Sequence, residues 1–263
     1  MAQRLADYGS EGVIGMLTPQ ANTTVEPEFW ALLPPGWSML NARLVSEKGS
    51  IEERLVDYTT RFAKTARRFA NAPLDALAIG CTGASYLIGP DAEARLVGEI
   101  GAERGVPVLT AALAAAEALS ALGARRIALL SPYPDSLNAA SKPYWEGHGL
   151  TVVATAGPAF EAAAFHPIYA MPGGDVLRAY ERLAESGADA VLMLGTGMAT
   201  LGPLLAAEGR GLPPAISCNL ALAWAAVQAA RGAARDAASL APWLSGECWG
   251  ARARALFPEI AGA

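Results

Sequence analysis

Apolar and polar positions along this 263-residue chain follow one repeating alternation. Short apolar runs, each bounded by Gly, Pro or a hydroxylated residue, are typical of buried strands. Between them lie longer stretches with apolar residues on one face, which predict amphipathic helices. This alternation indicates parallel sheets built from strand–helix–strand units, and therefore an α/β fold. The predicted strands are 13–17, 38–45, 75–79, 105–109, 125–130, 150–155, 190–194 and 214–217, and the predicted longer helices are 51–69, 91–103, 111–122, 136–147, 175–185 and 220–230.

A loop over residues 18–24 follows the first predicted strand and leads into a short helix, which the Leu-Pro-Pro-Gly sequence of residues 33–36 ends. Glu26 and Glu28 fall in the first turn of this helix, where the helix dipole favours negative charge. A side-chain cap for the first turn is expected from one of three residues, Asn22, Thr23 or Thr24.

The two halves of the chain resemble each other, which indicates an internal duplication. The matched segments are 14–20 with 127–133, 79–85 with 194–200, and 107–110 with 214–217. The spacing is also kept, because 67 residues separate Ile14 from Cys81 and 69 separate Ile127 from Thr196. Two similar lobes that face each other would form a cleft between their strand ends. We therefore expect Cys81 on one wall of this cleft and Thr196 on the other.

Cys81 stands directly after a predicted buried strand, in the sequence Gly-Cys-Thr-Gly-Ala-Ser of residues 80–85. Ligands of open parallel sheets bind at this carboxyl end of the strands. Backbone N–H groups of the following turn would favour the thiolate form of the cysteine. The pattern therefore favours a nucleophile or proton carrier, although a small buried apolar cysteine is the common alternative.

Composition and charge narrow the class of protein. Hydrophobic residues make up 52% of the chain and charged residues 17%, which is enough for a large core. The net charge of −5 and the lack of a basic run argue against nucleic acid as a partner. No apolar run reaches the roughly 18 residues of a membrane span, and residues 1–10 lack the apolar core of a signal peptide.

The cysteines and histidines give further expectations. Three cysteines without CxxC spacing indicate reduced thiols and a cytoplasmic protein. Only two histidines occur, far from any HExxH pattern, so no metal site is expected. Cys218 and Cys248 are expected to be structural. The Ala-rich helices 111–122 and 220–230 could form either core or the face of a homo-oligomer.

A single thiol in such a cleft permits two kinds of chemistry. Its thiolate can add to an activated C=C bond, or the thiol can protonate one face of an enediolate. A threonine hydroxyl is too weak an acid or base to replace a second thiol, so two-thiol racemisation is not expected. Either reaction needs hydrogen-bond donors for a carboxylate or enediolate. The candidate donors are the N–H groups of Thr82, Gly83, Gly197 and Met198 and the hydroxyls of Thr82, Ser85, Thr196 and Tyr133.

Four short motifs, in order along the chain, resemble the aspartate/glutamate racemase superfamily, and most closely its branch of maleate cis-trans isomerases and arylmalonate decarboxylases. They are Pro19-x-x-Asn22-Thr23-Thr24-x-Glu26, Gly80-Cys81-Thr82, Ser131-Pro132-Tyr133, and Ser217-x-Asn219 with Trp224 downstream. The resemblance implies two pseudo-symmetric flavodoxin-like lobes, each a short parallel sheet flanked by helices. The first lobe would comprise residues 12–122 with a returning segment 220–263, and the second residues 123–219. It also implies chemistry on small carboxylic acids without a cofactor.

The resemblance also assigns roles to individual residues. Cys81 matches the first-lobe cysteine, which in the isomerases is the nucleophile on the double bond. Asn22 matches a contact to the substrate carboxylate, and Tyr133 matches a tyrosine of the second-lobe loop. The chain departs from the pattern at Thr196, where many members have a second cysteine, and at Phe165-His166, near a substrate-binding asparagine of the isomerases. The expected catalytic residues are Cys81 and Thr196, and the expected substrate-binding residues are Gln20, Asn22, Thr82, Gly83, Ser85, Tyr133, Gly197 and Met198.

Three functions remain open from the sequence. The first is a cofactor-independent isomerase or racemase of a small dicarboxylic acid that works through Cys81. The second is a decarboxylase of a substituted malonate, and the third is a non-catalytic carboxylate-binding protein. Arg43, after the second strand, could pair with a substrate carboxylate, although a surface salt bridge is the simpler expectation.

Overall fold

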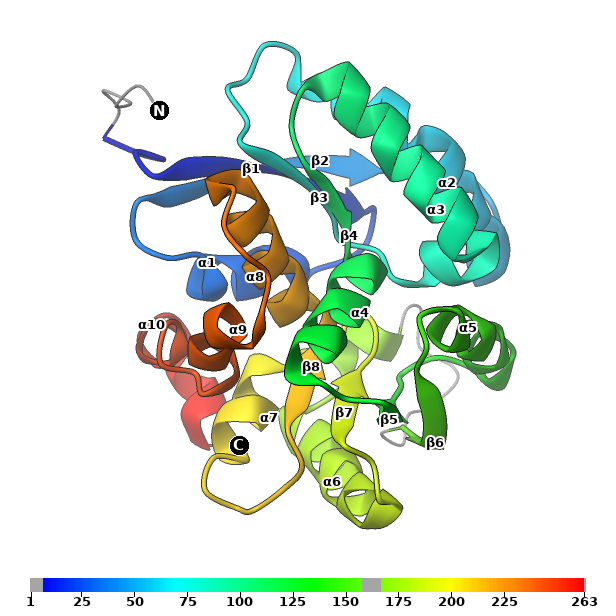
Figure 1. Ribbon diagram of the computed structural model, residues 1–263, viewed down its shortest axis with the longest axis vertical. Helices are drawn as coiled ribbons and strands as arrows, with labels where there is room; N and C mark the ends of the chain where they lie inside the picture. Colours follow the sequence, from blue (N-terminus) through cyan, green and yellow to red (C-terminus); the bar gives the residue numbers. More distant parts are fainter. Residues whose placement is uncertain (1–6, 158–166, 263) are drawn as a thin grey trace.

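Two four-stranded parallel sheets form the framework of the computed structural model, which describes residues 7–157 and 167–262 (Figure 1). The first sheet has the order β2-β1-β3-β4 and the second the order β6-β5-β7-β8. The strands of the first sheet are β1 (Gly12–Pro19), β2 (Trp37–Leu44), β3 (Ala76–Ile79) and β4 (Val108–Thr110). Those of the second are β5 (Arg126–Leu130), β6 (Thr151–Ala156), β7 (Ala190–Met193) and β8 (Ala215–Ser217).

The second sheet repeats the first strand for strand, as the internal duplication of the sequence predicts. In each sheet the first strand in the chain lies between the second and the third, and all pairs are parallel. This is the strand order of flavodoxin-like folds. The predicted fold class, an α/β protein of two pseudo-symmetric lobes, is confirmed.

Helices connect the strands, and α2 and α3 lie on the opposite side of the first sheet from α1 and α8 (Figure 1). Capping side chains explain where several of them begin: Ser50 and Glu53 form a capping box before α2, and Thr110 and Ser217 cap α4 and α8 at equivalent positions of the two lobes. The α-helices are α1 (Val25–Leu32), α2 (Ile51–Ala66), α3 (Gly83–Arg104), α4 (Ala111–Leu122), α5 (Asp135–Gly147), α6 (Gly173–Leu183), α7 (Leu201–Ala206), α8 (Cys218–Arg231), α9 (Ala237–Leu244) and α10 (Gly250–Leu256). The 3₁₀ helices are η1 (Arg67–Phe69), η2 (Pro167–Ala170), η3 (Ala184–Ser186) and η4 (Pro258–Gly262).

Helix α3 begins earlier than the sequence predicts, and this changes the surroundings of Cys81. The expected helix was 91–103, whereas α3 begins at Gly83 and bends at Gly89, whose φ is 77°. Gly89 breaks the helical geometry and Pro90 starts the second part, so the pair resembled a helix boundary in the sequence. The first part places helical N–H groups directly after Cys81.

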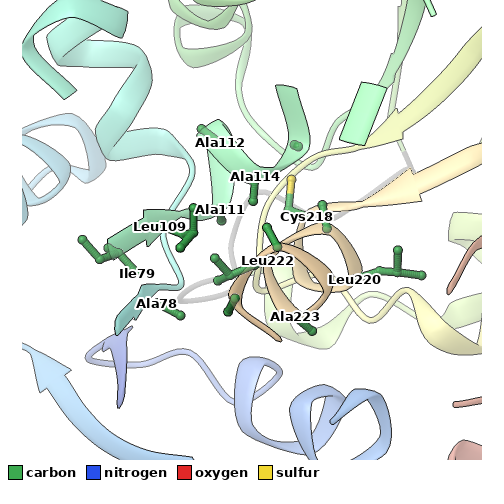
Figure 2. Close-up of a cluster of buried hydrophobic side chains, with 14 of the residues drawn as sticks. Ala78, Ile79, Leu109, Ala111, Ala112, Ala114, Cys218, Leu220, Leu222 and Ala223 are labelled. Carbon is green, nitrogen blue, oxygen red and sulfur yellow. The ribbon is translucent and has the colours of Figure 1, made fainter. Parts of the chain in front are cut away.

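Helices α4 and α8 pack against each other where the two lobes meet. Helix α8 follows the last strand of the second sheet, yet it contacts β1, β3 and β4 of the first. The contact is formed by small and aliphatic side chains that are buried, which include Ala111, Ala112 and Ala114 from α4 and Leu222 and Ala223 from α8 (Figure 2). The Ala-rich helices are therefore core.

The segment after α8 packs on the body of the protein through an arginine and two tryptophans. Arg252 donates from Nε to the carbonyl of Ala31 at 3.0 Å and from Nη2 to that of Leu32 at 3.2 Å. These carbonyls end α1, where a cation is favourable. The side chains of Trp243 and Trp249 in the same segment are buried, and Nε1 of Trp249 donates to the carbonyl of Trp243 at 2.8 Å. The sequence predicted this packing without placing it.

The longest helix among the described residues is α3, with 22 residues, and it carries several charged side chains, which include Asp91, Glu93 and Arg95. Within residues 7–157 and 167–262, no helix combines the length and the apolar character that crossing a membrane requires.

Candidate active site

A cavity between the two lobes opens at the carboxyl ends of strands from both sheets. The first lobe contributes residues that follow β1 and β3, together with the start of α2. The second lobe contributes residues that follow β5 and β7, together with η2. The described lining residues are Pro19, Asn22, Ile51, Arg54, Leu55, Tyr58, Cys81, Thr82, Tyr133, Ile168, Tyr169, Thr196 and Gly197.

Cys81 lies between the end of β3 and the start of α3, and its side chain is only 3% exposed. The N–H groups of Gly83 and Ala84 donate to the sulfur. Burial raises the pKa of the Cys81 thiol to about 11, although these two N–H groups act in the opposite direction. The sequence predicted that N–H dipoles would favour the thiolate. They do, but the cost of burying the charge is larger, so the thiol is protonated at neutral pH.

A pair of hydroxyls joins the two lobes next to Cys81. The Thr82 Oγ1 atom lies 2.8 Å from the hydroxyl oxygen of Tyr133, which follows β5. Gly195 allows this approach, because its φ of +82° is unfavourable for other residues and a Cβ there would lie 3.2 Å from the Tyr133 hydroxyl. Burial raises the pKa of Tyr133 well above its ordinary value, so the phenol stays a hydrogen-bond donor.

A second connection between the lobes runs through Thr196 and Asn22. The Thr196 hydroxyl donates to the carbonyl of Gly80 at 2.7 Å and accepts from Nδ2 of Asn22 at 3.1 Å. The Oδ1 atom of Asn22 accepts from the N–H groups of Thr24 and Val25, at 2.8 and 3.0 Å, and so caps α1. Asn22 therefore both caps its helix and lines the cavity. The one hydroxyl proton of Thr196 is held by a backbone carbonyl.

Glu28 is a buried carboxylate that fixes the second-lobe loop behind Thr196. It accepts from the N–H groups of Thr200 and Leu201, at 2.5 and 3.2 Å, and from Nδ2 of Asn219 at 2.7 Å. Burial raises the pKa of Glu28, and these hydrogen bonds oppose the rise. The sequence placed Glu28 at the positive end of a helix dipole only. In the fold it connects α1 with the loop after β7 and with α8.

The structure brings six of the ten predicted site residues into the cavity lining: Asn22, Cys81, Thr82, Tyr133, Thr196 and Gly197. The other four lie outside the described lining. Gln20 accepts from the N–H of Ser46 at 2.6 Å, and the N–H of Gly83 bonds to the Cys81 sulfur. Ser85 donates to the buried carboxylate of Glu93 at 2.5 Å, and Met198 is fully buried in the core of the second lobe.

Helix α2 supplies cavity residues that sequence reasoning missed. Ile51, Arg54, Leu55 and Tyr58 follow helical spacing on one face of α2, and that face covers the cavity. Arg54 borders the cavity with a partly buried side chain, although the hydrogen bonds of its guanidinium are exposed. The apolar stripe was visible in the sequence, but nothing local marked it as a wall rather than core.

Arg43 and Cys218, which the sequence analysis also considered, make contacts within the protein rather than line the cavity. Arg43 pairs with Glu26 at 2.6 Å and donates to the carbonyl of Asn22 at 2.9 Å, so the salt bridge is the alternative that the structure supports. Cys218 is buried at the start of α8, and burial raises its pKa to about 12. His166 lies outside the described residues. Nowhere in residues 7–157 and 167–262 do three or more His, Cys, Asp or Glu side chains gather as metal ligands.

The family model of arylmalonate decarboxylase matches residues 14–241 of this chain. The maleate isomerase of Nocardia farcinica is 31% identical over 189 residues, which span 68% of this chain and 74% of that protein. The maleate isomerase of Geobacillus stearothermophilus is 30% identical over 152 residues, or 53% of this chain and 60% of that protein.

Solved structures of similar proteins share the fold. A mutant of the maleate cis-trans isomerase of Nocardia farcinica, with a covalently bound succinylcysteine intermediate, has a TM-score of 0.74 and 26% identity over 84% of this chain and 93% of that one. The maleate isomerase of Pseudomonas putida S16 has a TM-score of 0.75 at 20% identity, with the same coverage of both chains. A mutant of arylmalonate decarboxylase in a liganded form has a TM-score of 0.72 at 24% identity, and covers 85% of this chain and 94% of that one.

Proposed function

Because the chain belongs to the arylmalonate decarboxylase family, we propose that it is a cofactor-independent isomerase of a small unsaturated dicarboxylic acid of the maleate type. Membership makes the protein an enzyme, an isomerase or a decarboxylase, that works through a cysteine. The substrate class and the roles of the individual residues are the proposal. Cys81 is the nucleophile, and Thr82, Tyr133 and Asn22 hold the substrate.

One observation carries the proposal. The Cys81 sulfur lines a cavity between two lobes, and the polar lining groups that the structure describes, apart from Arg54 on α2, are neutral and come from both lobes. Hydroxyl, amide and backbone donors can hold a substrate carboxylate by hydrogen bonds and leave the thiol free to react. The relative with a succinylcysteine intermediate supports a carbon–sulfur bond in this kind of cavity.

The addition step uses the substrate as proton acceptor. The described lining contains no carboxylate or imidazole to take the thiol proton. The Sγ–H bond of Cys81 breaks, its proton passes to a carboxylate oxygen of the bound dianion, and Sγ bonds to one carbon of the C=C bond. The π-electron pair moves onto the carboxylate group attached to the other carbon, which becomes an enediolate. One of the Thr82 and Tyr133 hydroxyls donates to the other, so the pair has one proton left to donate to this developing charge.

Rotation and elimination complete the reaction. The former double bond is a single bond in the adduct, so the two carboxylate groups can rotate from cis to trans. The electron pair then re-forms the C=C bond, the carbon–sulfur bond breaks, and the proton returns to Sγ. Neither electrons nor protons are gained or lost, so the cycle needs no metal or coenzyme.

One observation supports the decarboxylase as a second candidate function, namely that the Cys81 thiol is protonated. In this reaction a C–C bond of a malonate breaks, CO₂ leaves, and the electron pair stays on the α-carbon as an enediolate. Cys81 then donates its proton to one face of that carbon. A pKa of about 11 keeps Cys81 protonated, which suits a proton donor. Ile51, Leu55 and Ile168 give the cavity an apolar wall for the departing CO₂.

A substrate panel separates the two functions. Purified protein is incubated with maleate, phenylmalonate and methylmalonate, and products are followed by proton NMR and by CO₂ release. We expect fumarate from maleate and no CO₂ from either malonate. CO₂ release together with unchanged maleate would contradict the isomerase and support the decarboxylase. If no compound is converted, the proposed substrate class is wrong.

A further inference from the structure

Arg54 differs in charge from every other described residue of the cavity. Among the lining side chains in residues 7–157 and 167–262, it is the one that carries a charge, and it is half-buried. A cation that is partly removed from water is costly unless it has an anionic or hydrogen-bonding partner. Its surroundings therefore indicate what the cavity is built to receive.

The guanidinium of Arg54 is held in place but is not neutralised. Its Nη1 atom donates to the carbonyls of Lys48 and Gly49, at 3.3 and 2.9 Å, in the turn that precedes α2. No carboxylate of the described chain pairs with it. Arg61, two helical turns further along α2, by contrast pairs with Asp57. The Nε and Nη2 donors of Arg54 have no described acceptor, so they are available to a ligand.

Arg54 and Cys81 line the same cavity from different elements of the fold. The pKa of Cys81 is shifted by burial and by the N–H groups of Gly83 and Ala84, and Arg54 is not among the causes. The pKa of Tyr58 and of Tyr169, by contrast, responds to both Cys81 and Arg54. Arg54 comes from α2, whereas Thr82 and Tyr133, the hydroxyl pair beside Cys81, follow β3 and β5, so Arg54 belongs to a different wall of the cavity.

We infer that Arg54 is a specificity-determining residue that binds the second carboxylate of the substrate, the one remote from the carbon that Cys81 attacks. A guanidinium with two free donors matches a carboxylate in charge and in fork geometry. The neutral donors near Cys81 hold the other carboxylate. The inference rests on the proposed dicarboxylate substrate and deepens it, because it explains why two anionic groups are required.

The test uses ligands that cannot be isomerised, so that binding is read without turnover. Succinate and its monoamide, succinamate, have the same size, lack a C=C bond, and differ by one carboxylate. Their affinities are measured by calorimetry for the wild type, Arg54→Gln and Arg54→Lys. Arg61→Gln is the matched control, since it removes an arginine of the same helix that pairs with Asp57 and is not among the described lining residues of the cavity. Thermal melts show that each variant is folded.

We expect the wild type and Arg61→Gln to prefer succinate over succinamate by about 10- to 100-fold, the range of a charge-assisted hydrogen bond. Arg54→Gln should lose this preference by weakening succinate and leaving succinamate nearly unchanged, and Arg54→Lys should keep part of it. An unchanged preference in Arg54→Gln, or a wild type that binds neither ligand or both equally, would overturn the inference. Maleate turnover is measured separately, so an inactive protein with the expected binding pattern refutes the isomerase alone.

Discussion

The amide nitrogen of Asn22 lies 3.1 Å from the hydroxyl oxygen of Thr196, so a residue of the first lobe is hydrogen-bonded to the wall of the second. The hydroxyl in turn donates to the carbonyl of Gly80, the residue before Cys81. Thr196 thus acts as a structural bridge between the loop after β7 and the residue before Cys81. A proton carrier at this position would have to release the Gly80 carbonyl first.

We expect Thr196→Val to lower stability more than it changes the chemistry. Valine keeps the shape of the side chain but leaves the Gly80 carbonyl and one Asn22 N–H without their partner. The expected loss in the free energy of unfolding is about 1–3 kcal/mol, measured by urea denaturation. Thr196→Ser keeps the hydroxyl and is the control. Turnover should fall but persist in Thr196→Val, and its complete loss in a folded variant would show that the hydroxyl takes part in the reaction.

Alkylation of Cys81 should depend on pH in the way a buried thiol requires. Because burial raises the pKa of Cys81 to about 11, only a small fraction is thiolate at pH 7. The rate of reaction with iodoacetamide, followed at the Cys81 peptide by mass spectrometry, should still be rising at pH 10. The sequence alone suggested a pKa below that of a free thiol. A rate that levels off below pH 8.5 would show that the thiolate is stabilised in the empty site.

The same shift predicts a loss of stability at alkaline pH. The folded pKa of Cys81 lies above the ordinary thiol value of about 8.5, so the folded protein binds this proton more tightly than the unfolded chain. Its contribution to stability is full below about pH 8.5 and is lost as the pH rises toward 11. Comparing Cys81→Ala with the wild type by denaturation from pH 7 to 10 isolates the contribution of the Cys81 thiol to the free energy of unfolding. The free energy of unfolding should fall less steeply in the variant, and parallel curves would contradict the shift.

Glu28 should be far more important for stability than its neighbour Glu26. Glu28→Ala leaves the N–H groups of Thr200 and Leu201 and the amide of Asn219 unpaired in the interior, with an expected loss of about 2–4 kcal/mol. Glu26→Ala removes a partly exposed ion pair with Arg43 and should cost less than about 1 kcal/mol. Denaturation of the two variants under one condition makes the comparison, and equal losses would mean that Glu28 does not hold the loop.

Local patterns explain what could be predicted from the sequence. The strand before Cys81 and the turn after it are adjacent in the chain, so the position of the thiol at a strand end followed from a short apolar run and its glycines. The internal duplication could likewise be inferred from matched local segments of the sequence. It implied that loops more than a hundred residues apart face each other, as those of Gly80 and Thr196 do through a hydrogen bond of 2.7 Å.

Long-range packing explains the features that could not be predicted from the sequence. Arg54 and Tyr58 show an ordinary amphipathic pattern, and only the placement of α2 over the cavity brings them into its lining. Glu28 became a link between lobes because α1 packs beside Thr200 and Asn219. The raised pKa of Cys81 reflects how completely the surrounding elements exclude water, which the sequence around the cysteine does not contain.

The most direct test of catalysis by Cys81 is to trap the adduct. Wild type and Cys81→Ser are mixed with maleate without added metal or coenzyme, quenched in acid, digested and analysed by mass spectrometry, while fumarate is followed by NMR. We expect fumarate from the wild type, with a succinyl group on the Cys81 peptide, and neither product nor adduct from Cys81→Ser. Fumarate formation by Cys81→Ser at the wild-type rate, or an adduct on a different residue, would contradict the role of Cys81 as nucleophile.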